Sequence, residues 1–152
     1  MIALLQRVSS ASVHVSGQLL AQIDRGLLVL VGVEPWDDEA TAARLLERLL
    51  AYRVFADREG RMNRSLADIE GGLLLVPQFT LAADTRKGNR PGFSTAAAPA
   101  QAEALFDSLY QQALKAYPAA QRGCFGADMQ VALVNDGPVT FWLQVPTTPA
   151  QS

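Results

Sequence analysis

The run Gly26-Leu27-Leu28-Val29-Leu30-Val31-Gly32-Val33 contains no polar side chain. A helix that crosses a membrane needs about 20 apolar residues, so this run is too short to do so. Short apolar runs that are rich in β-branched residues are typical of strands that are covered on both faces. We therefore predict a buried strand over residues 27–33.

Strand patterns also precede this run. Residues 1–8 and 11–15 are rich in apolar and β-branched side chains, and Ser16-Gly17 supplies a turn. A further strand is predicted over residues 18–23. The first part of the chain is therefore expected to be mostly β-structure joined by tight turns.

A helix is predicted next, and either Asp37 or Asp38 can cap its beginning. Its buried face is expected to comprise apolar residues at helical spacing, namely Ala42, Leu45, Leu46, Leu49 and Leu50. A short strand over residues 53–56 and a turn over residues 57–60 follow. A longer apolar strand is predicted over residues 73–81.

Residues 82–98 show no hydrophobic period, and loops of this length within a small domain tend to be functional or mobile. Pro99 suits the first turn of a second helix, which Pro118 ends. The buried face of that helix is expected to comprise Ala102, Leu105, Phe106, Leu109, Tyr110 and Ala113. Strands over residues 129–134 and 139–145 are predicted to close a mixed α/β domain of residues 1–146, with a flexible tail at 147–152.

Composition excludes several classes of protein. Hydrophobic residues make up 49% of the chain and charged residues 18%, which favours a compact globular domain over a disordered chain. The single cysteine cannot form an internal disulfide, so the cytoplasm is the expected compartment. One cysteine and one histidine are too few for a typical zinc site, and we expect no metal and no membrane segment. The net charge of -2 argues against a nonspecific nucleic-acid coat, although a local basic patch remains compatible with binding one RNA end.

Three segments could carry chemistry. Gln78 and Thr80 interrupt the apolar strand where it meets the long loop, and they either face solvent or line a ligand site at the strand end. Residues 135–138 are predicted to form a hairpin turn between two strands. The alternative is that this segment has a functional role. Residues 86–90 carry three cations, which either contact RNA phosphates or are simply solvated.

Together these residues resemble the D-aminoacyl-tRNA deacylase family along almost the whole chain. Two family motifs carry the resemblance: S-Q-F-T-L, here Pro77-Gln78-Phe79-Thr80-Leu81, and N-x-G-P-V-T, here Asn135-Asp136-Gly137-Pro138-Val139-Thr140. Further similar blocks are Gln6-Arg7-Val8 with Ala11-Ser12-Val13, residues 26–33, residues 55–66, and Lys87-Gly88-Asn89-Arg90-Pro91 with Phe93. Pro77 departs from the usual serine, which removes any role for a hydroxyl or a backbone N–H at this position.

The resemblance implies a single three-layer α/β domain with mixed, largely antiparallel β-sheets and two main helices packed on one side. It also implies a homodimer that hydrolyses the ester bond of D-aminoacyl-tRNA, and of glycyl-tRNA formed on tRNA(Ala), without a cofactor and without binding DNA. L-aminoacyl-tRNA would be rejected by a cis Gly137-Pro138 backbone that reaches into the partner's pocket. The implied catalytic residues are Gln78, Phe79 and Thr80, and the implied substrate-binding residues are Gly137, Pro138, Arg7 and Met129.

An aminoacyl ester is already activated, so its hydrolysis needs a positioned water and donors for the developing oxyanion. Backbone N–H groups near Phe79 and Thr80 are the expected donors, aided by the 2′-hydroxyl of the terminal ribose. A covalent role for Thr80 is the rival mechanism, and it requires an adjacent base. A non-catalytic RNA-end binding protein and a general esterase are the alternatives of other classes.

Overall fold

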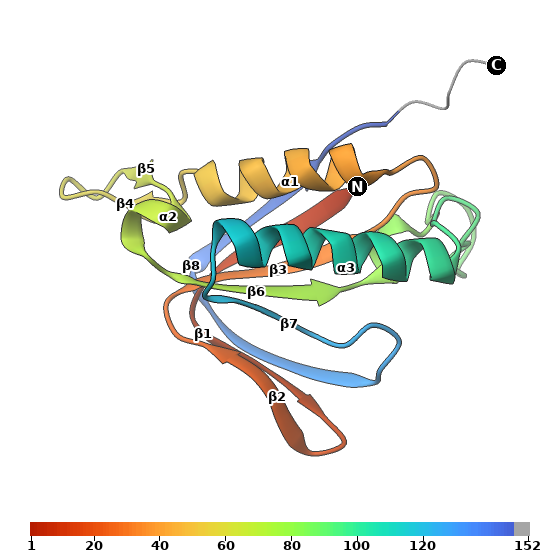
Figure 1. Cartoon of the computed structure of the whole chain (residues 1–152), viewed down its shortest axis with the longest axis horizontal. Coiled ribbons are helices and arrows are strands. Elements are labelled where there is room, and N and C mark those ends of the chain that lie inside the picture. The colour runs from red at the N-terminus through yellow and green to blue at the C-terminus, as the bar shows by residue number, and fades with distance from the viewer. Residues whose placement is uncertain (148–152) are drawn as a thin grey trace.

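The computed structural model describes residues 1–147, and the predicted tail beyond Thr147 lies outside the described residues. In chain order the elements are β1 (Ile2–Val15), β2 (Gln18–Ile23), β3 (Gly26–Gly32), α1 (Glu39–Ala51), β4 (Phe55–Ala56), β5 (Met62–Arg64), α2 (Leu66–Ile69), β6 (Gly72–Pro77), the 3-10 helix η1 (Phe79–Ala82), α3 (Pro99–Ala116), β7 (Ala120–Arg122) and β8 (Met129–Gln144). Figure 1 shows α1 and α3 lying side by side over one face of the sheet. Within the described chain, no helix is both long and apolar enough to cross a membrane.

The long strand β1 organises the sheet. Its first half pairs antiparallel with β3, its second half pairs antiparallel with β2, and β8 pairs antiparallel with both halves. β3 then pairs parallel with β6, and β6 pairs parallel with β7. The expected mixed and largely antiparallel sheet is therefore confirmed.

Alternate residues of β3 serve two different cores. Leu27, Val29 and Val31 are buried in the larger core together with the apolar faces of α1 and α3. Leu28 points the other way, into a second core that includes Val13. This alternation explains why the run has no polar residue, and it confirms that two helices pack on one side of the sheet.

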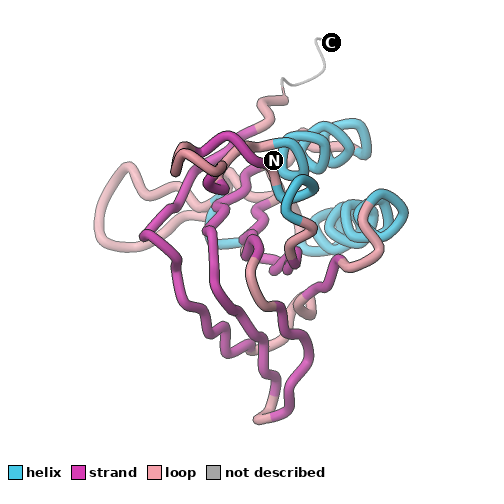
Figure 2. The backbone as a smooth tube through the Cα atoms, turned by 90° about the vertical axis from the view of Figure 1, so that its left-hand side faces the viewer, coloured by secondary structure: helices cyan, strands magenta, loops and turns pink. Residues whose placement is uncertain are grey.

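The strands form a bent wall, as Figure 2 shows, and the two edge strands of the sheet, β2 and β7, are in contact. The side-chain amide of Gln121 on β7 accepts a hydrogen bond from the Gln22 N–H of β2 at 2.9 Å and donates to the Gln22 carbonyl at 2.7 Å. One side chain therefore replaces a rung of backbone pairing between β2 and β7. The second core lies inside this bent wall.

The predicted hairpin turn at residues 135–138 is wrong, because β8 runs through this segment as one strand. Gln6 pairs with Thr140 and Val8 pairs with Asn135, so Arg7 alone stands opposite residues 136–139. The long unbroken β1 offers partners to both halves of β8, so the chain leaves the ladder and returns to it without reversing. We call residues 136–139 the excursion.

The predicted strand over residues 73–81 is too long. β6 ends at Pro77, which has no N–H to extend the ladder, and residues 79–82 turn into η1. The Leu81 N–H donates to the Gln78 carbonyl at 3.2 Å and closes the first turn. Gln78 and Thr80 therefore do not lie on a strand face.

Three further short elements were not predicted, namely β5, α2 and β7. α2 has only one turn, capped by Ser65, and so it shows no hydrophobic period. β7 spans three residues, and its pairing with β6 depends on contacts that are distant in sequence.

Candidate active site

A pocket of about 270 Å³ opens where β6 ends and β8 begins. Its lining comprises Val76, Pro77, Gln78, Phe79, Phe125, Gly126, Ala127, Met129 and Val131. Met129 lies against Gly123, where any Cβ would come within 2.8 Å of the Met129 sulfur. The Met129 sulfur also accepts a hydrogen bond from the Cys124 N–H at 3.3 Å, which fixes the side chain at the pocket floor.

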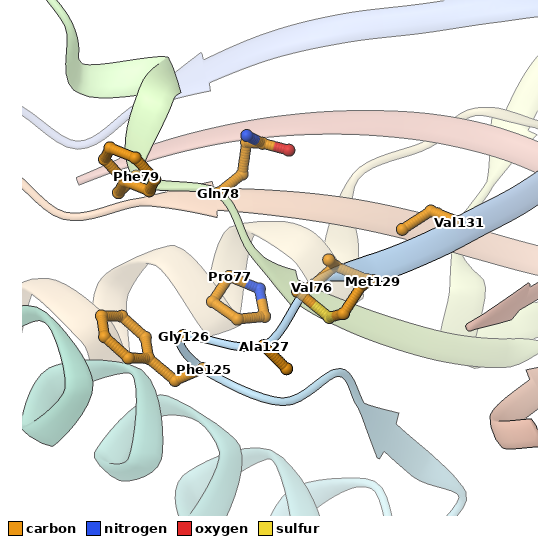
Figure 3. Close-up of a pocket in the computed structure, with 9 residues that line it drawn as sticks. All are labelled: Val76, Pro77, Gln78, Phe79, Phe125, Gly126, Ala127, Met129 and Val131. Carbon is orange, nitrogen blue, oxygen red and sulfur yellow. The ribbon is translucent and has the colours of Figure 1, made fainter. Parts of the chain in front are cut away.

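The segment 77–80, which we call the pocket segment, offers mainly its backbone to this pocket. Figure 3 shows the Gln78 amide pointing away from Phe125 and Met129. The Gln78 N–H donates to the Val31 carbonyl at 2.8 Å, which ties the segment to the end of β3. Phe79 and Thr80 begin η1, and within residues 1–147 no acceptor satisfies their N–H groups.

None of the nine residues that line the pocket has a titratable side chain. The hydroxyl of Thr80, beside the pocket, accepts a hydrogen bond from the Gln78 amide. An amide is not a base at neutral pH, so nothing in this pair activates the hydroxyl as a nucleophile. Among the described residues, no group of three or more His, Cys, Asp or Glu side chains is placed to hold a metal ion.

The excursion lies apart from the pocket of its own chain and is exposed at Gly137 and Pro138. The Gly137-Pro138 peptide bond is cis, and Gly137 has φ +134°. Asn135 braces the base of the excursion, because its amide accepts from the Val139 N–H at 2.8 Å and donates to the Thr140 hydroxyl at 3.1 Å. The excursion is thus held firmly although its apex contacts little of its own chain.

Arg7 supports the excursion from below. Its Nε donates to the Asp136 carbonyl at 3.0 Å, and its Nη1 donates to the Val54 carbonyl at 2.7 Å. The side chain is only 16% exposed, and its Nε also lies 3.6 Å from the Asp136 carboxylate, so the guanidinium is largely committed to these partners. Arg7 therefore lies under the Gly137-Pro138 segment and not in the pocket lining.

The residues proposed from the sequence thus form two groups. Gln78, Phe79 and Met129 line one pocket, with Thr80 next to it. Arg7, Gly137 and Pro138 form a second group at the excursion. Within one chain, the structure does not bring these groups together.

Sequence reasoning missed the far wall of the pocket, which Phe125, Gly126 and Ala127 provide. These residues follow β7, whose pairing with β6 brings them opposite the pocket segment. The sequence contained one signal for this wall. Phe125 is an aromatic residue next to Gly126, in a short segment just before a predicted strand.

Comparison with known proteins places this geometry in a family. The model of the D-Tyr-tRNA(Tyr) deacylase family matches residues 4–144. A D-aminoacyl-tRNA deacylase of Pseudomonas aeruginosa (strain LESB58) is 65% identical over 144 residues, covering 95% of this chain and 99% of that protein. A D-aminoacyl-tRNA deacylase of Thioalkalivibrio sulfidiphilus is 62% identical over 146 residues, covering 96% of this chain and 98% of that protein.

Solved structures share the fold. One described as c-Myc DNA Unwinding Element Binding Protein superposes with a TM-score of 0.92 and 39% identity, covering 97% of this chain and all of that chain. One described as a probable eukaryotic D-amino acid tRNA deacylase superposes with a TM-score of 0.85 at 17% identity, covering 95% of this chain and 98% of that chain, which supports the fold alone. The family match, the near-complete coverage of the relatives and the fold agree, and the chain belongs to the D-Tyr-tRNA(Tyr) deacylase family.

Proposed function

We propose that this chain hydrolyses the ester bond of D-aminoacyl-tRNA and releases the free D-amino acid and tRNA. The observation that carries the proposal is the 65% identity to a D-aminoacyl-tRNA deacylase over 95% of the chain. The aligned part includes nearly all residues of both chains, so it includes both the pocket segment and the excursion. The reaction belongs to translation quality control, and we assign it to the cytoplasm.

The N–H groups of Phe79 and Thr80 are the proposed oxyanion donors. They are adjacent, they lie at the rim of the pocket, and no described residue accepts from them. Water attacks the ester carbonyl carbon, and the carbonyl oxygen becomes an oxyanion between these donors. The bond to the ribose oxygen then breaks, the ribose oxygen takes a proton, and the D-amino acid leaves as a carboxylate.

The proton transfers in this scheme fall to the 2′-hydroxyl of the terminal ribose and to water. The pocket lining supports this assignment because it contains no titratable side chain. A nucleophilic Thr80 would require a base beside it, and the hydrogen-bonded neighbour is the Gln78 amide. The mechanism needs no cofactor.

A second copy of the chain is the proposed source of the missing part of the pocket. Gly137 and Pro138 are exposed and braced, yet they do not line the pocket of their own chain. Within the described chain, β8 pairs on one side only, and it exposes Val134 by 58% and Trp142 by 52%. A two-fold symmetric dimer through this region would place the excursion of each chain against its partner.

The excursion is also the proposed chirality filter. D- and L-residues differ only in which position at the α-carbon carries hydrogen. A rigid backbone close to one position excludes every L side chain and admits D-residues and glycine, so glycyl-tRNA formed on tRNA(Ala) is a proposed second substrate. Backbone suits this role because side-chain rotamers yield more easily.

One experiment separates the candidate functions. Catalytic amounts of protein are incubated with D-Tyr-tRNA, with L-Tyr-tRNA and with a free D-tyrosine ester, and the released amino acid is measured. Turnover of D-Tyr-tRNA alone is the expected result. Binding of tRNA without turnover would indicate an RNA-end binding protein, and turnover of the free ester would indicate a general esterase.

A further inference from the structure

A basic loop lies next to the pocket segment and plays no part in the proposed hydrolysis. Asp84 and Gly92 exchange two backbone hydrogen bonds of 2.7 and 2.9 Å, which pin the loop between them at its base. A hollow of about 450 Å³ is lined by these two residues together with Arg86, Lys87 and Arg90. The loop is thus closed at its base and carries its cations at its exposed part.

The three cations of this loop are not equivalent. Arg86 donates to both carboxylate oxygens of Asp84 at 2.8 Å, and this pairing lowers the pKa of Asp84 to about 2. Asp84 therefore stays ionised at neutral pH and matches the charge of Arg86. Lys87 and Arg90 are both exposed, and within residues 1–147 they form no ion pair and no side-chain hydrogen bond. These two cations are available to a ligand that carries negative charge.

Two exposed aromatic rings join this loop to the pocket. Phe79 is 57% exposed and Phe93 is 45% exposed, and their ring centroids lie 5.3 Å apart with planes tilted by 43°. Phe79 also lines the pocket, and Phe93 directly follows Gly92 at the base of the loop. The pocket, the two rings and the two cations therefore form a continuous surface, which we call the approach surface.

Exposed aromatic rings beside unpaired cations match single-stranded nucleic acid. Every base has a face that stacks on an aromatic ring, and each phosphate attracts a lysine or arginine. We propose that the approach surface binds the unpaired nucleotides that precede the terminal adenosine of tRNA. Phe93 stacks on a base, while Lys87 and Arg90 contact phosphates.

This proposal rests on the proposed function, because it assumes that the pocket holds the aminoacylated end of the tRNA and that the preceding nucleotides extend outward from it. It is consistent with a net charge of -2 for the whole chain, since only a local cluster of cations is required. A double helix would present its bases stacked and paired, so the rings favour an unpaired strand.

The first test measures RNA binding directly. Fluorescence anisotropy follows an uncharged RNA oligonucleotide that ends in unpaired CCA, with a duplex DNA oligonucleotide for comparison. Phe93→Leu keeps an apolar side chain but lacks the ring, and it should weaken RNA binding about tenfold. Phe93→Trp keeps an aromatic ring and should bind the RNA with the affinity of the wild-type chain. The double variant Lys87→Ala with Arg90→Ala should reduce the slope of log affinity against log salt by about 1.4, as expected for two phosphates of a single strand.

A matched control and a kinetic test complete the design. Arg58→Ala with Arg61→Ala removes two exposed cations from a different turn and should leave binding and its salt slope unchanged. For D-Tyr-tRNA, the approach-surface variants should raise KM far more than they lower kcat. D-tyrosyl-adenosine lacks the nucleotides that precede the terminal adenosine, so it serves as the comparison substrate. The rise in KM should be absent for this substrate.

The binding assay judges the proposal independently of catalysis. A folded Phe93→Leu variant with wild-type RNA affinity would overturn it, as would equal affinity for duplex DNA or no binding of the RNA by the wild-type chain. Loss of hydrolysis with RNA binding intact would instead overturn the proposed function and leave the approach surface supported.

Discussion

The pocket segment and the excursion are both irregular backbone at places where regular strand pairing is interrupted, but they are built differently. The pocket segment follows a buried strand, is tied to Val31, and lines a cavity formed by its own chain. The excursion emerges from the middle of β8, is braced by Asn135 and Arg7, and is not part of the pocket lining. Structure that is held firmly yet contacts little indicates a role toward another molecule.

This difference is the basis for the separate roles that we propose for the two segments. In the proposed reaction, the pocket segment supplies the oxyanion donors, and the excursion supplies the backbone that rejects L-residues. Three substitutions test this division, and one titration probes the loop that follows the pocket segment. They are ordered from the largest expected effect to the smallest.

The largest effect is expected from Gly137→Ala. A Cβ at this position would lie 2.7 Å from Val139 Cγ2 and 3.0 Å from Val139 N, at a φ of +134° that L side chains rarely adopt. The excursion must shift, and a displacement of this size lowers kcat/KM for D-Tyr-tRNA about 100-fold. Gly60→Ala is the matched control, because Gly60 also has a positive φ of +81° but nothing lies within 4 Å of its added Cβ. Full activity and selectivity in Gly137→Ala would show that the excursion has no part in the reaction.

Arg7→Ala is expected to have the next largest effect. The change leaves the carbonyl of the buried Val54 without its donor, which destabilises the fold by about 1–3 kcal/mol, and it removes the donor to the exposed Asp136 carbonyl. The loosened excursion should also reduce discrimination between D-Tyr-tRNA and L-Tyr-tRNA. Urea unfolding and paired deacylation assays measure the two effects. Arg44→Ala, which breaks an exposed pair with Glu47, should change stability by less than about 0.5 kcal/mol, and selectivity unchanged in folded Arg7→Ala would contradict the bracing role.

Thr80→Ala tests the other half of the comparison. The substitution removes the hydroxyl but keeps the backbone N–H, so kcat should fall less than about tenfold, equivalent to about 1.4 kcal/mol. Single-turnover deacylation measures it. A loss of several orders of magnitude with normal folding, or a covalent aminoacyl group trapped on Thr80, would favour the nucleophilic mechanism instead.

The smallest effect concerns the loop that follows the pocket segment. The Arg86 guanidinium holds the pKa of Asp84 at about 2, below the ordinary value of 3.8. A lowered pKa means that the pairing contributes fully above about pH 4 and is lost as the pH falls toward about 2. The Arg86 amide resonance should therefore titrate with a midpoint near 2, whereas a midpoint near 3.8 would show that the pair does not form in solution.

The sequence predicted the elements whose pattern is local. The apolar run at residues 26–33, the faces of α1 and α3, and the turn at Ser16 and Gly17 all follow from spacing within one segment. Ser16 and Gly17 indeed adopt positive φ values of 50° and 77°. These predictions are confirmed because neighbouring residues alone determine them.

Two of the wrong or missing predictions depended on distant parts of the chain, whereas the excess length of the predicted strand 73–81 has a local cause in Pro77. Asp136-Gly137 would be an ordinary hairpin turn if β1 were short, and only the length of β1 lets both halves of β8 pair with it. The pocket wall at Phe125 exists because β7 pairs with β6. Spacing within one segment contains no information about the pairing of β8 with β1 or of β7 with β6. The pocket segment could therefore be predicted only from its resemblance to a family motif, and its backbone geometry could not be predicted.

The contact between Gln121 and Gln22 has a consequence for how the edge of β2 can meet another chain. An unpaired strand edge is a template on which another chain can add a strand. The Gln121 amide occupies both the N–H and the carbonyl that Gln22 turns away from β1, so an incoming strand would first have to displace it. The side chain of Gln121 thus closes the outer edge of β2 near its C-terminal end, where β2 meets β7.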